Sequence, residues 1–289
     1  AVDCSSEIDI NGVMAGSHKG GYDPFTLDIT SFVKGSGPQL HELKVTDPAD
    51  KGLQPRGKQV SKPNSIWYTS VTGIWRTVWI EAVPKTYIES FKLVPDIDGQ
   101  ILAADIKIKG QLPGDMIRIS SWDGVQMVSE KESAAGSVIY LPVKEPKLWS
   151  PENPFLYDLK IAVIRGGKTV DEVKSYFAMR KISLKPDESG VLRMMLNNQF
   201  VFQYGPLDQG WWPDGLYTAP TDEALLFDIV KTKEMGFNTI RKHVKTEPDR
   251  WYYHCDKTGM LVWQDMPSGD LGGHRWNTNP GMEGGNDKV

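Results

Sequence analysis

The sequence predicts a multi-domain, mainly β protein whose last third changes to alternating strands and helices. Two patterns support the β part: short segments that alternate polar and apolar residues recur through about the first 183 residues, and turns rich in glycine or proline separate them. The third observation is that strands and helices alternate with short connections in residues 184–289, which implies a parallel sheet. We therefore expect an immunoglobulin-like β-sandwich followed by the first part of an (α/β)8 TIM barrel.

The first expected domain, residues 1–84, consists of strands and turns. Asn11 and Gly12 form the strongest hairpin dipeptide, and residues 26–29, 43–45 and 73–81 alternate with a period of two. The stretch of residues 47–63 is rich in Pro, Gly and Lys and must be a long loop. Loops of that length are usually functional or mobile.

The second expected domain, residues 85–183, has the pattern of a β-sandwich. Residues 87–89, 104–108, 117–119 and 159–163 alternate, and glycine-containing turns separate them. This spacing over roughly 100 residues is typical of an immunoglobulin-like sandwich. A proline-braced corner at residues 149–154 precedes the strand that begins near Leu156.

The third expected domain, residues 184–289, begins with a hairpin turn at Asn197 and Asn198. Thr221 can cap a helix that ends near Gly236, and Pro248 opens a second helix over residues 249–258. Strands are expected at residues 200–203, 237–240 and 260–263, paired in parallel. A full barrel needs about 250 residues, so this region supplies only its N-terminal portion.

Composition excludes several classes of protein. The net charge is −4 over 289 residues with 39% hydrophobic residues, and no basic run indicates a nucleic-acid surface. No stretch approaches the ~18 apolar residues of a membrane span. Cys4 and Cys255 lie in different expected domains, so we expect no disulfide, and the histidine spacings match no zinc motif. We expect no metal and no cofactor. Residues 1–3 look like the middle of a strand and carry no targeting information.

Polar and aromatic side chains follow the expected strands at residues 208–215, 240–243 and 263–265. Side chains at the carboxyl ends of successive parallel strands form the active site of an (α/β) barrel. Arg241 and Gln264 are expected to be structural residues near this site. The expected substrate-binding residues are Asp208, Trp211, Trp212, His243 and Asp265.

Each of these candidates also has a plainer interpretation. His243 either binds a substrate hydroxyl or bonds to a backbone carbonyl, and Trp211 and Trp212 either stack on a sugar or pack in a core. A buried Arg241 needs a carboxylate partner, for which Asp265 on the next strand is the candidate.

At this point the chain resembles glycoside hydrolase family 2, the β-galactosidase, β-glucuronidase and β-mannosidase family. Residues 10–30 resemble the family's sugar-binding jelly roll, and residues 73–81 resemble the signature near the end of that domain. Residues 148–157 and 177–182 are similar to the sandwich that follows, and residues 236–243 are similar to the early barrel. The motifs occur in the family's order along the whole chain.

The resemblance implies a segment of a retaining, β-galactosidase-like exo-glycosidase that takes part in carbohydrate breakdown. It also implies that residues 1–84 are a partial jelly roll without its first strands. The family's Asn-Glu pair is absent, so both catalytic glutamates are expected beyond Val289, no catalytic residue is expected in this chain, and the chain alone should be inactive. In β-galactosidases two residues separate the arginine and the histidine that follow the second barrel strand. Here only Lys242 separates Arg241 from His243, which weakens the transfer of galactose-site roles.

The alternative is a non-catalytic carbohydrate-binding or scaffold protein. A metal-dependent hydrolase is a third interpretation, which would require an ion bound by histidines. The resemblance favours a periplasmic or extracellular bacterial location and a carbohydrate as the partner, and it leaves homo-oligomerisation open. The sugar and its linkage do not follow from the sequence.

Overall fold

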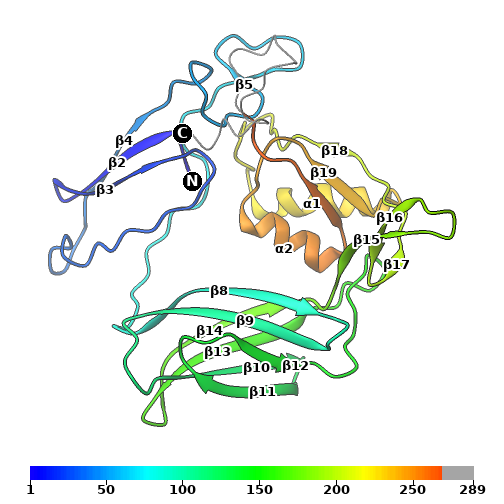
Figure 1. Cartoon of the computed structure of the whole chain (residues 1–289). Helices are drawn as coiled ribbons and strands as arrows, with labels where there is room; N and C mark the ends of the chain where they lie inside the picture. The colour runs from blue at the N-terminus through cyan, green and yellow to red at the C-terminus, as the bar shows by residue number, and fades with distance from the viewer. Residues whose placement is uncertain (269–289) are drawn as a thin grey trace. The chain divides into compact units, whose positions relative to one another are not determined.

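The computed structural model describes residues 1–268 and divides the chain into two compact units (Figure 1). The first, the N/C unit, comprises Ala1–Trp79, Gly205–Tyr252 and the described residues from Val262 on, and the second, the sandwich unit, comprises Ile80–Tyr204 and Tyr253–Leu261. Strands predominate in both, so the predicted mainly β fold is confirmed. The division into three domains, with boundaries expected at residues 84 and 183, stays a prediction.

Two antiparallel sheets form the β-sandwich of the sandwich unit. One has the order β11-β10-β13-β14 and the other the order β12-β9-β8. The strands are β8 (Tyr87–Asp96), β9 (Ile101–Lys109), β10 (Met116–Asp123), β11 (Gln126–Ala134), β12 (Ile139–Pro142), β13 (Tyr157–Arg165) and β14 (Lys168–Phe177).

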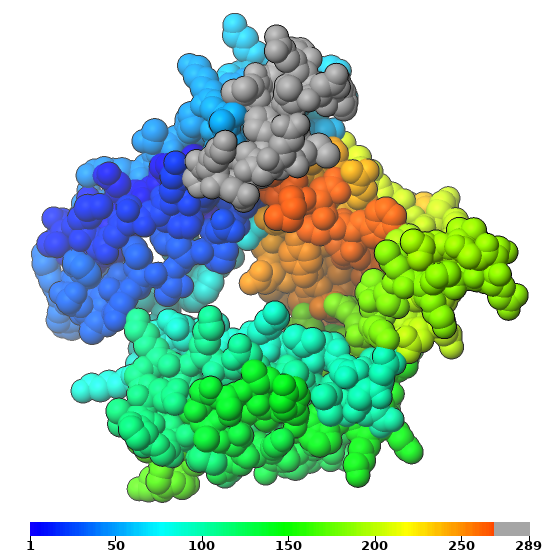
Figure 2. All heavy atoms as spheres, in the orientation of Figure 1, coloured from blue at the N-terminus to red at the C-terminus, as the bar shows by residue number. Residues whose placement is uncertain are grey.

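The core of the sandwich follows from the alternation in its strands. On β10, Ile117 and Ile119 are fully buried, whereas Arg118 between them faces solvent and pairs with Glu132 at 2.9 Å. They share one hydrophobic cluster with residues of β9 such as Leu102, so the two sheets pack face to face. On the face shown in Figure 2, the atoms of both sheets form one continuous surface, in cyan and green.

A hairpin sheet and part of a helix complete the sandwich unit. Strands β15 (Ile182–Pro186), β16 (Leu192–Leu196) and β17 (Gln199–Phe200) pair antiparallel, and Asn197 and Asn198 make the turn with φ of 52° and 65°. Trp149, at the predicted proline-braced corner, is fully buried and donates its indole N–H to the Asp256 carbonyl at 2.7 Å. The Asp256 carboxylate binds Arg180 at 2.7 Å, which fixes this helical segment within the unit.

Short sheets form the N-terminal part of the N/C unit. The sheet β3-β2-β4 has β2 (Ser5–Ile10), β3 (Val13–Lys19) and β4 (His41–Thr46), with the predicted turn at Asn11 and Gly12. Two small pairs are β1 (Val2–Asp3) with β7 (Gly73–Ile74) and β5 (Gln59–Val60) with β6 (Tyr68–Thr69). The partial jelly roll itself stays a prediction.

Two strands expected in this part differ from the structure. Residues 26–29 form no strand, and of residues 73–81 only Gly73–Ile74 is a strand. An alternating segment such as residues 73–81 forms a strand only where a neighbouring strand pairs with its backbone. Within residues 1–268, only β1 does so, and Val78, Trp79 and Ile80 remain 67–70% exposed.

A parallel sheet, helix α1 and the start of helix α2 form the rest of the N/C unit. Strands β18 (Leu207–Asp208) and β19 (Thr239–Lys242) pair in parallel, and β20 (Leu261–Gln264) is the other neighbour of β19. Helix α1 (Asp222–Glu234) begins at Thr221, whose side chain accepts the Ala224 N–H at 3.1 Å, and α2 (Asp249–Thr258) follows Pro248.

The first parallel strand was expected at residues 200–203 and is instead Leu207–Asp208. Gln199 and Phe200 continue the hairpin as β17, so they cannot start the parallel sheet. The strand, helix, strand, helix, strand order is nevertheless as predicted, and it places the ends of β18, β19 and β20 at one edge.

Candidate functional site

The carboxyl ends of the three parallel strands bring Asp208, His243 and Asp265 together. Asp208 is the last residue of β18, and His243 and Asp265 directly follow β19 and β20. Backbone bonds extend the ladder here: His243 N–H donates to the Asp208 carbonyl at 2.8 Å, and Asp265 N–H donates to the Lys242 carbonyl at 3.0 Å. This edge is where parallel α/β sheets place ligand sites.

Asp265 is held by two basic side chains. Arg241 forms a fork with it, with Nε 3.1 Å and Nη2 2.9 Å from the two carboxylate oxygens, so the Arg241–Asp265 pair anticipated from the sequence is present. His243 Nδ1 lies 2.9 Å from Asp265 Oδ2. Burial alone would raise the pKa of Asp265, but the bonds from Arg241 and His243 outweigh it, so the pKa lies below its usual value. Asp265 is therefore an ionised residue that orients His243.

Asp208 is fixed from both sides. Its Oδ1 accepts the Gly210 N–H at 2.7 Å, and its Oδ2 accepts a bond from Lys242 Nζ at 2.7 Å. Gly210 has φ of 61°, and a Cβ on it would lie 2.2 Å from Glu247 Oε1. Glycine is thus required at this turn, and the turn sets the direction of the Asp208 carboxylate.

Below this rim lies a buried ionic cluster that the sequence analysis missed, made of Lys242, Lys245 and Glu247. Glu247 Oε1 accepts from Lys242 Nζ at 2.9 Å and from Lys245 Nζ at 3.1 Å. Lys245 Nζ also donates to the carbonyls of Gly210 and Tyr217 at 2.6 and 2.8 Å. Burial, with the like charge of Lys242, lowers the pKa of Lys245 to about 8, although Glu247 opposes the change.

Lysine is ordinarily placed at the surface, which is why the cluster escaped sequence analysis. The available signal was two lysines three residues apart, followed by a glutamate, directly after a buried strand. Lys242 lies 4.4 Å from the centroid of a Trp251 ring, so aromatic packing shields part of the charge.

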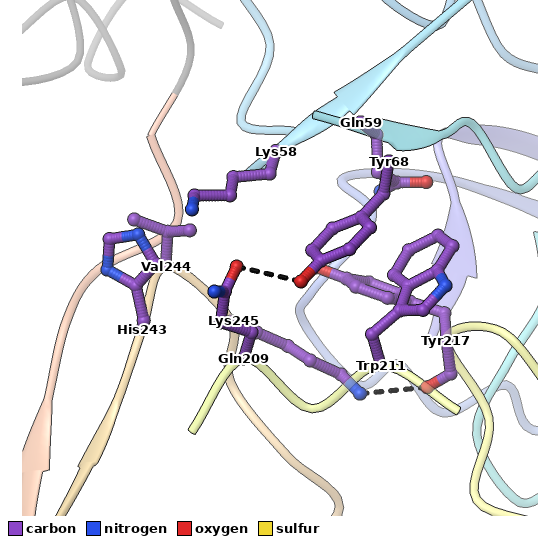
Figure 3. A pocket seen from close by; sticks show the side chains of 9 residues that line it. All are labelled: Lys58, Gln59, Tyr68, Gln209, Trp211, Tyr217, His243, Val244 and Lys245. Carbon is purple, nitrogen blue, oxygen red and sulfur yellow. Dashed lines mark hydrogen bonds between the residues drawn. The ribbon is translucent and has the colours of Figure 1, made fainter. Parts of the chain in front are cut away.

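A small open hollow of about 220 Å³ adjoins the rim (Figure 3). Trp211 forms one wall and stacks on Tyr68, with ring centroids 4.4 Å apart and an interplanar angle of 8°. The Tyr68 hydroxyl donates to Gln209 Oε1 at 2.9 Å, as the dashed line in Figure 3 shows. The hollow is lined by Lys58, Gln59, Tyr68, Gln209, Trp211, Tyr217, His243, Val244 and Lys245.

Lys58 and Gln59, which lie in the expected loop at residues 47–63, and Tyr68, the first residue of β6, were not predicted as site residues. For Lys58 and Gln59 the sequence signal was the length of the loop at residues 47–63, which does not include Tyr68.

The remaining predicted residues separate into two roles. Trp212 does not line the hollow; its backbone bridges to Leu216, and its buried indole N–H has no hydrogen-bond partner among the described residues. Gln264 links two segments of the site by hydrogen bonds. Its Nε2 donates to the Lys245 carbonyl at 2.8 Å, and its Oε1 accepts from the Tyr252 hydroxyl at 2.5 Å. Gln264 thus has contacts suited to the structural role expected of it.

Comparison with known proteins connects this geometry to a family. Residues 86–180 match the family model described as glycosyl hydrolases family 2. This match assigns residues 86–180 to glycosyl hydrolase family 2. The chain is 29% identical over 96% of its length to a Formosa agariphila protein named "Putative beta-glucuronidase", and 26% identical over 94% to a Thermoanaerobacter pseudethanolicus beta-galactosidase. These alignments span 34% and 37% of the two relatives, so the chain covers about a third of their length.

Solved structures show the same fold. A beta-glucuronidase from Ruminococcus gnavus superposes with a TM-score of 0.77 at 19% identity, over 93% of this chain and 46% of the other. The family-model match over residues 86–180 bears out the recognition of family 2 from the sequence motifs.

Within residues 1–268, no group of three or more His, Cys, Asp and Glu side chains is arranged to hold a metal ion. Neither helix in that range is long and apolar enough to cross a membrane.

Proposed function

We propose that this chain is part of a retaining exo-glycosidase of β-galactosidase type, which hydrolyses O-glycosidic bonds in carbohydrate breakdown. The observation that carries the proposal is the convergence of Asp208, His243 and Asp265 at the carboxyl ends of β18, β19 and β20. In this family context, these groups suit the binding of sugar hydroxyls, because carboxylates accept and imidazoles exchange hydrogen bonds. Trp211 offers an aromatic wall beside them.

The carboxylates of this edge are suited to binding rather than to bond cleavage. Retention requires two carboxyl groups about 5–5.5 Å apart, one a nucleophile and one a general acid with a raised pKa. Asp265 has the opposite shift, since Arg241 and His243 hold its pKa below the usual value despite burial. Glu247 is enclosed by two lysines. We therefore propose that the catalytic glutamates belong to residues outside this chain and that the chain alone is inactive.

The test is an assay of the purified chain beside the longer protein with aryl β-galactoside, β-glucuronide and β-mannoside. We expect turnover only from the longer protein, since general acid catalysis alone contributes about 10²–10⁴ in rate. Asp208→Asn and Asp265→Asn in the longer protein should raise KM. The matched control is Asp23→Asn, which changes an exposed aspartate of the same unit.

Turnover by the isolated chain that disappears in Asp208→Asn or Asp265→Asn would refute this assignment. The rival function, a carbohydrate-binding or scaffold protein, is favoured by the ion pairs that Asp208 and Asp265 form at the rim. Absence of turnover from the longer protein on all three substrates, together with sugar binding, would establish the rival.

A further inference from the structure

A groove lies within the sandwich unit, between the strands β13 and β14 and the last turns of helix α2. Its volume is about 510 Å³, within the roughly 300–1,000 Å³ of small-molecule sites. Every residue that lines it belongs to the sandwich unit, whereas Asp208, His243 and Asp265 belong to the N/C unit. The groove therefore shares no residue with the candidate site described above.

The floor of the groove is the face of the four-stranded sheet that points away from the sandwich core. Asp158 on β13 lies directly opposite Tyr176 on β14. Their chain neighbours Tyr157 and Phe177 belong to the hydrophobic core. Because successive side chains of a strand point to opposite faces, Asp158 and Tyr176 point outward, and so does Lys174.

Two tyrosine rings in the groove are held in place by protein contacts. The Tyr176 hydroxyl donates to Asp256 Oδ2 at 3.0 Å. The Tyr253 ring on α2 meets the Tyr176 ring edge to face, with ring centroids 5.3 Å apart and an interplanar angle of 62°. Both side chains are only half-buried. The rings are thus ordered before a ligand arrives, which lowers the entropic cost of binding.

A third aromatic side chain extends the row beyond the groove. Trp122 on β10 lies directly opposite Asp158, on the outer side of the neighbouring strand (Figure 1). Adjacent strands are about 4.7–4.9 Å apart, so Trp122 and Tyr176 stand on strands about 9–10 Å apart, with Asp158 between them. The Trp122 indole N–H donates to Ser120 Oγ at 2.9 Å, which fixes the ring. Exposed Lys160 lies 5.2 Å from its centroid and would give way to a stacked ligand.

The charged groups of this face retain hydrogen-bonding capacity. Within residues 1–268, neither the exposed Asp158 carboxylate nor the exposed Lys174 ammonium has a hydrogen bond or an ion pair. Asp158 can therefore accept bonds from hydroxyl groups, and Lys174 can donate. A carboxylate in the middle of the row also repels an anionic ligand. Aromatic faces with an acceptor and a donor beside them match an uncharged sugar, which has apolar C–H faces and hydroxyl groups at its edges.

We propose that this face of the sandwich is a separate binding site for an uncharged oligosaccharide chain. Tyr176 and Trp122 stack on sugar rings of the chain, and Asp158 accepts hydrogen bonds from hydroxyls between them. The site holds a carbohydrate without acting on it, so the inference stands for a hydrolase and for a non-catalytic protein alike.

The test is titration calorimetry on the full chain with four probes: cellohexaose, mannohexaose, hexagalacturonate and methyl β-D-galactoside. We expect at least one of the two neutral hexasaccharides to bind tenfold or more tightly than the other two probes. Asp158 repels the anionic chain, and the monosaccharide contacts only one ring at a time. The preferred hexasaccharide identifies the sugar of the chain.

Three variants assign the binding to this face. Tyr176→Ala should weaken it about 3- to 10-fold, the usual effect of losing one aromatic contact. Asp158→Ala should weaken it by a similar factor, through the loss of its hydrogen bonds. Tyr176→Phe keeps the ring and should retain most of the affinity, although it loses the bond to Asp256.

Tyr140→Ala and Asp105→Ala are the matched controls, because both residues are exposed and lie on β12 and β9 of the other sheet. They should leave every affinity unchanged. Thermal unfolding of each variant separates a lost contact from a lost fold. Asp158 is exposed and unpaired within residues 1–268, so Asp158→Ala keeps the test valid if Tyr176→Ala unfolds.

Four results would overturn the inference. They are binding of neither neutral hexasaccharide, equal affinity for the neutral and anionic chains, equal losses in the control variants, and binding by this chain that the longer protein does not show. Binding that Asp265→Asn abolishes and Tyr176→Ala leaves intact would also contradict it, because the oligosaccharide would then occupy the carboxyl ends of the parallel strands. None of these outcomes bears on the hydrolysis of aryl glycosides, so the proposed function is tested separately.

Discussion

Replacing Glu247 by glutamine should strongly destabilise the N/C unit. The Glu247 carboxylate is 3% exposed and neutralises Lys242 and Lys245, whose side chains are each 1% exposed. Removing one partner of a buried ion pair typically costs about 3–5 kcal/mol, because the other charge remains buried. Asp208 still pairs with Lys242, and Lys245 can release its proton, so the lower half of that range is expected.

The free energy of unfolding should be measured in urea at pH 6 and pH 9, by tryptophan fluorescence. The pKa of Lys245 in the folded chain is already about 8, so the uncharged form is more accessible at pH 9, and the penalty should be smaller there. Glu42→Gln, at an exposed position of β4, is the control and should change stability by less than about 0.5 kcal/mol. A loss below about 1 kcal/mol at pH 6 would refute the view that Glu247 neutralises both lysines.

Three further changes test other contacts. Burial, and then Asp47, raise the pKa of Asp3 to about 7 in the folded chain, above the ordinary 3.8. Stability of the N/C unit should therefore rise as pH falls from about 7 to 4, and urea titrations should show a flat profile for Asp3→Asn. Asp265→Asn should cost about 1 kcal/mol or less in urea, because the Arg241 side chain is 49% exposed, yet it should weaken sugar binding in calorimetry. Trp211→Ala, which loses the stack on Tyr68, should cost about 1–3 kcal/mol in thermal unfolding and also weaken sugar binding; unchanged affinity would contradict its place in the site.

Elements with local signals were predictable from the sequence. Thr221 and Pro248 mark the starts of α1 and α2, because capping and proline chemistry act within one turn of the helix. Hairpin turns at residues 11–12 and 197–198 were found for the same reason. The first parallel strand was predicted at the wrong residues, because Phe200 pairs with Met195 in the hairpin instead of joining the parallel sheet. Alternation alone does not decide which of these two sheets a segment joins.

The residues of the site also differ in whether the sequence could predict them. Asp208, His243 and Asp265 could be predicted as neighbours because strand order alone places their strand ends at one edge. Tyr68 reaches Gln209 across 141 residues of sequence, and no local pattern encodes such a contact. The buried lysines were missed because their cost is offset by Glu247 and backbone carbonyls, which only the folded chain assembles.

The two compact units are interleaved along the chain, and this has a consequence for synthesis on the ribosome. The main segment of the sandwich unit, Ile80–Tyr204, is continuous and contains every sandwich strand, so it can fold as soon as it emerges. Ala1–Trp79 can complete its unit only after Gly205–Tyr252 has been synthesised. At about 5–20 residues per second, the ribosome needs roughly ten seconds or more to proceed from Trp79 to Tyr252. Ribosome-bound chains arrested near residue 240 should therefore contain a protease-resistant sandwich while Val13 and Met14 belong to a segment that is still cleaved.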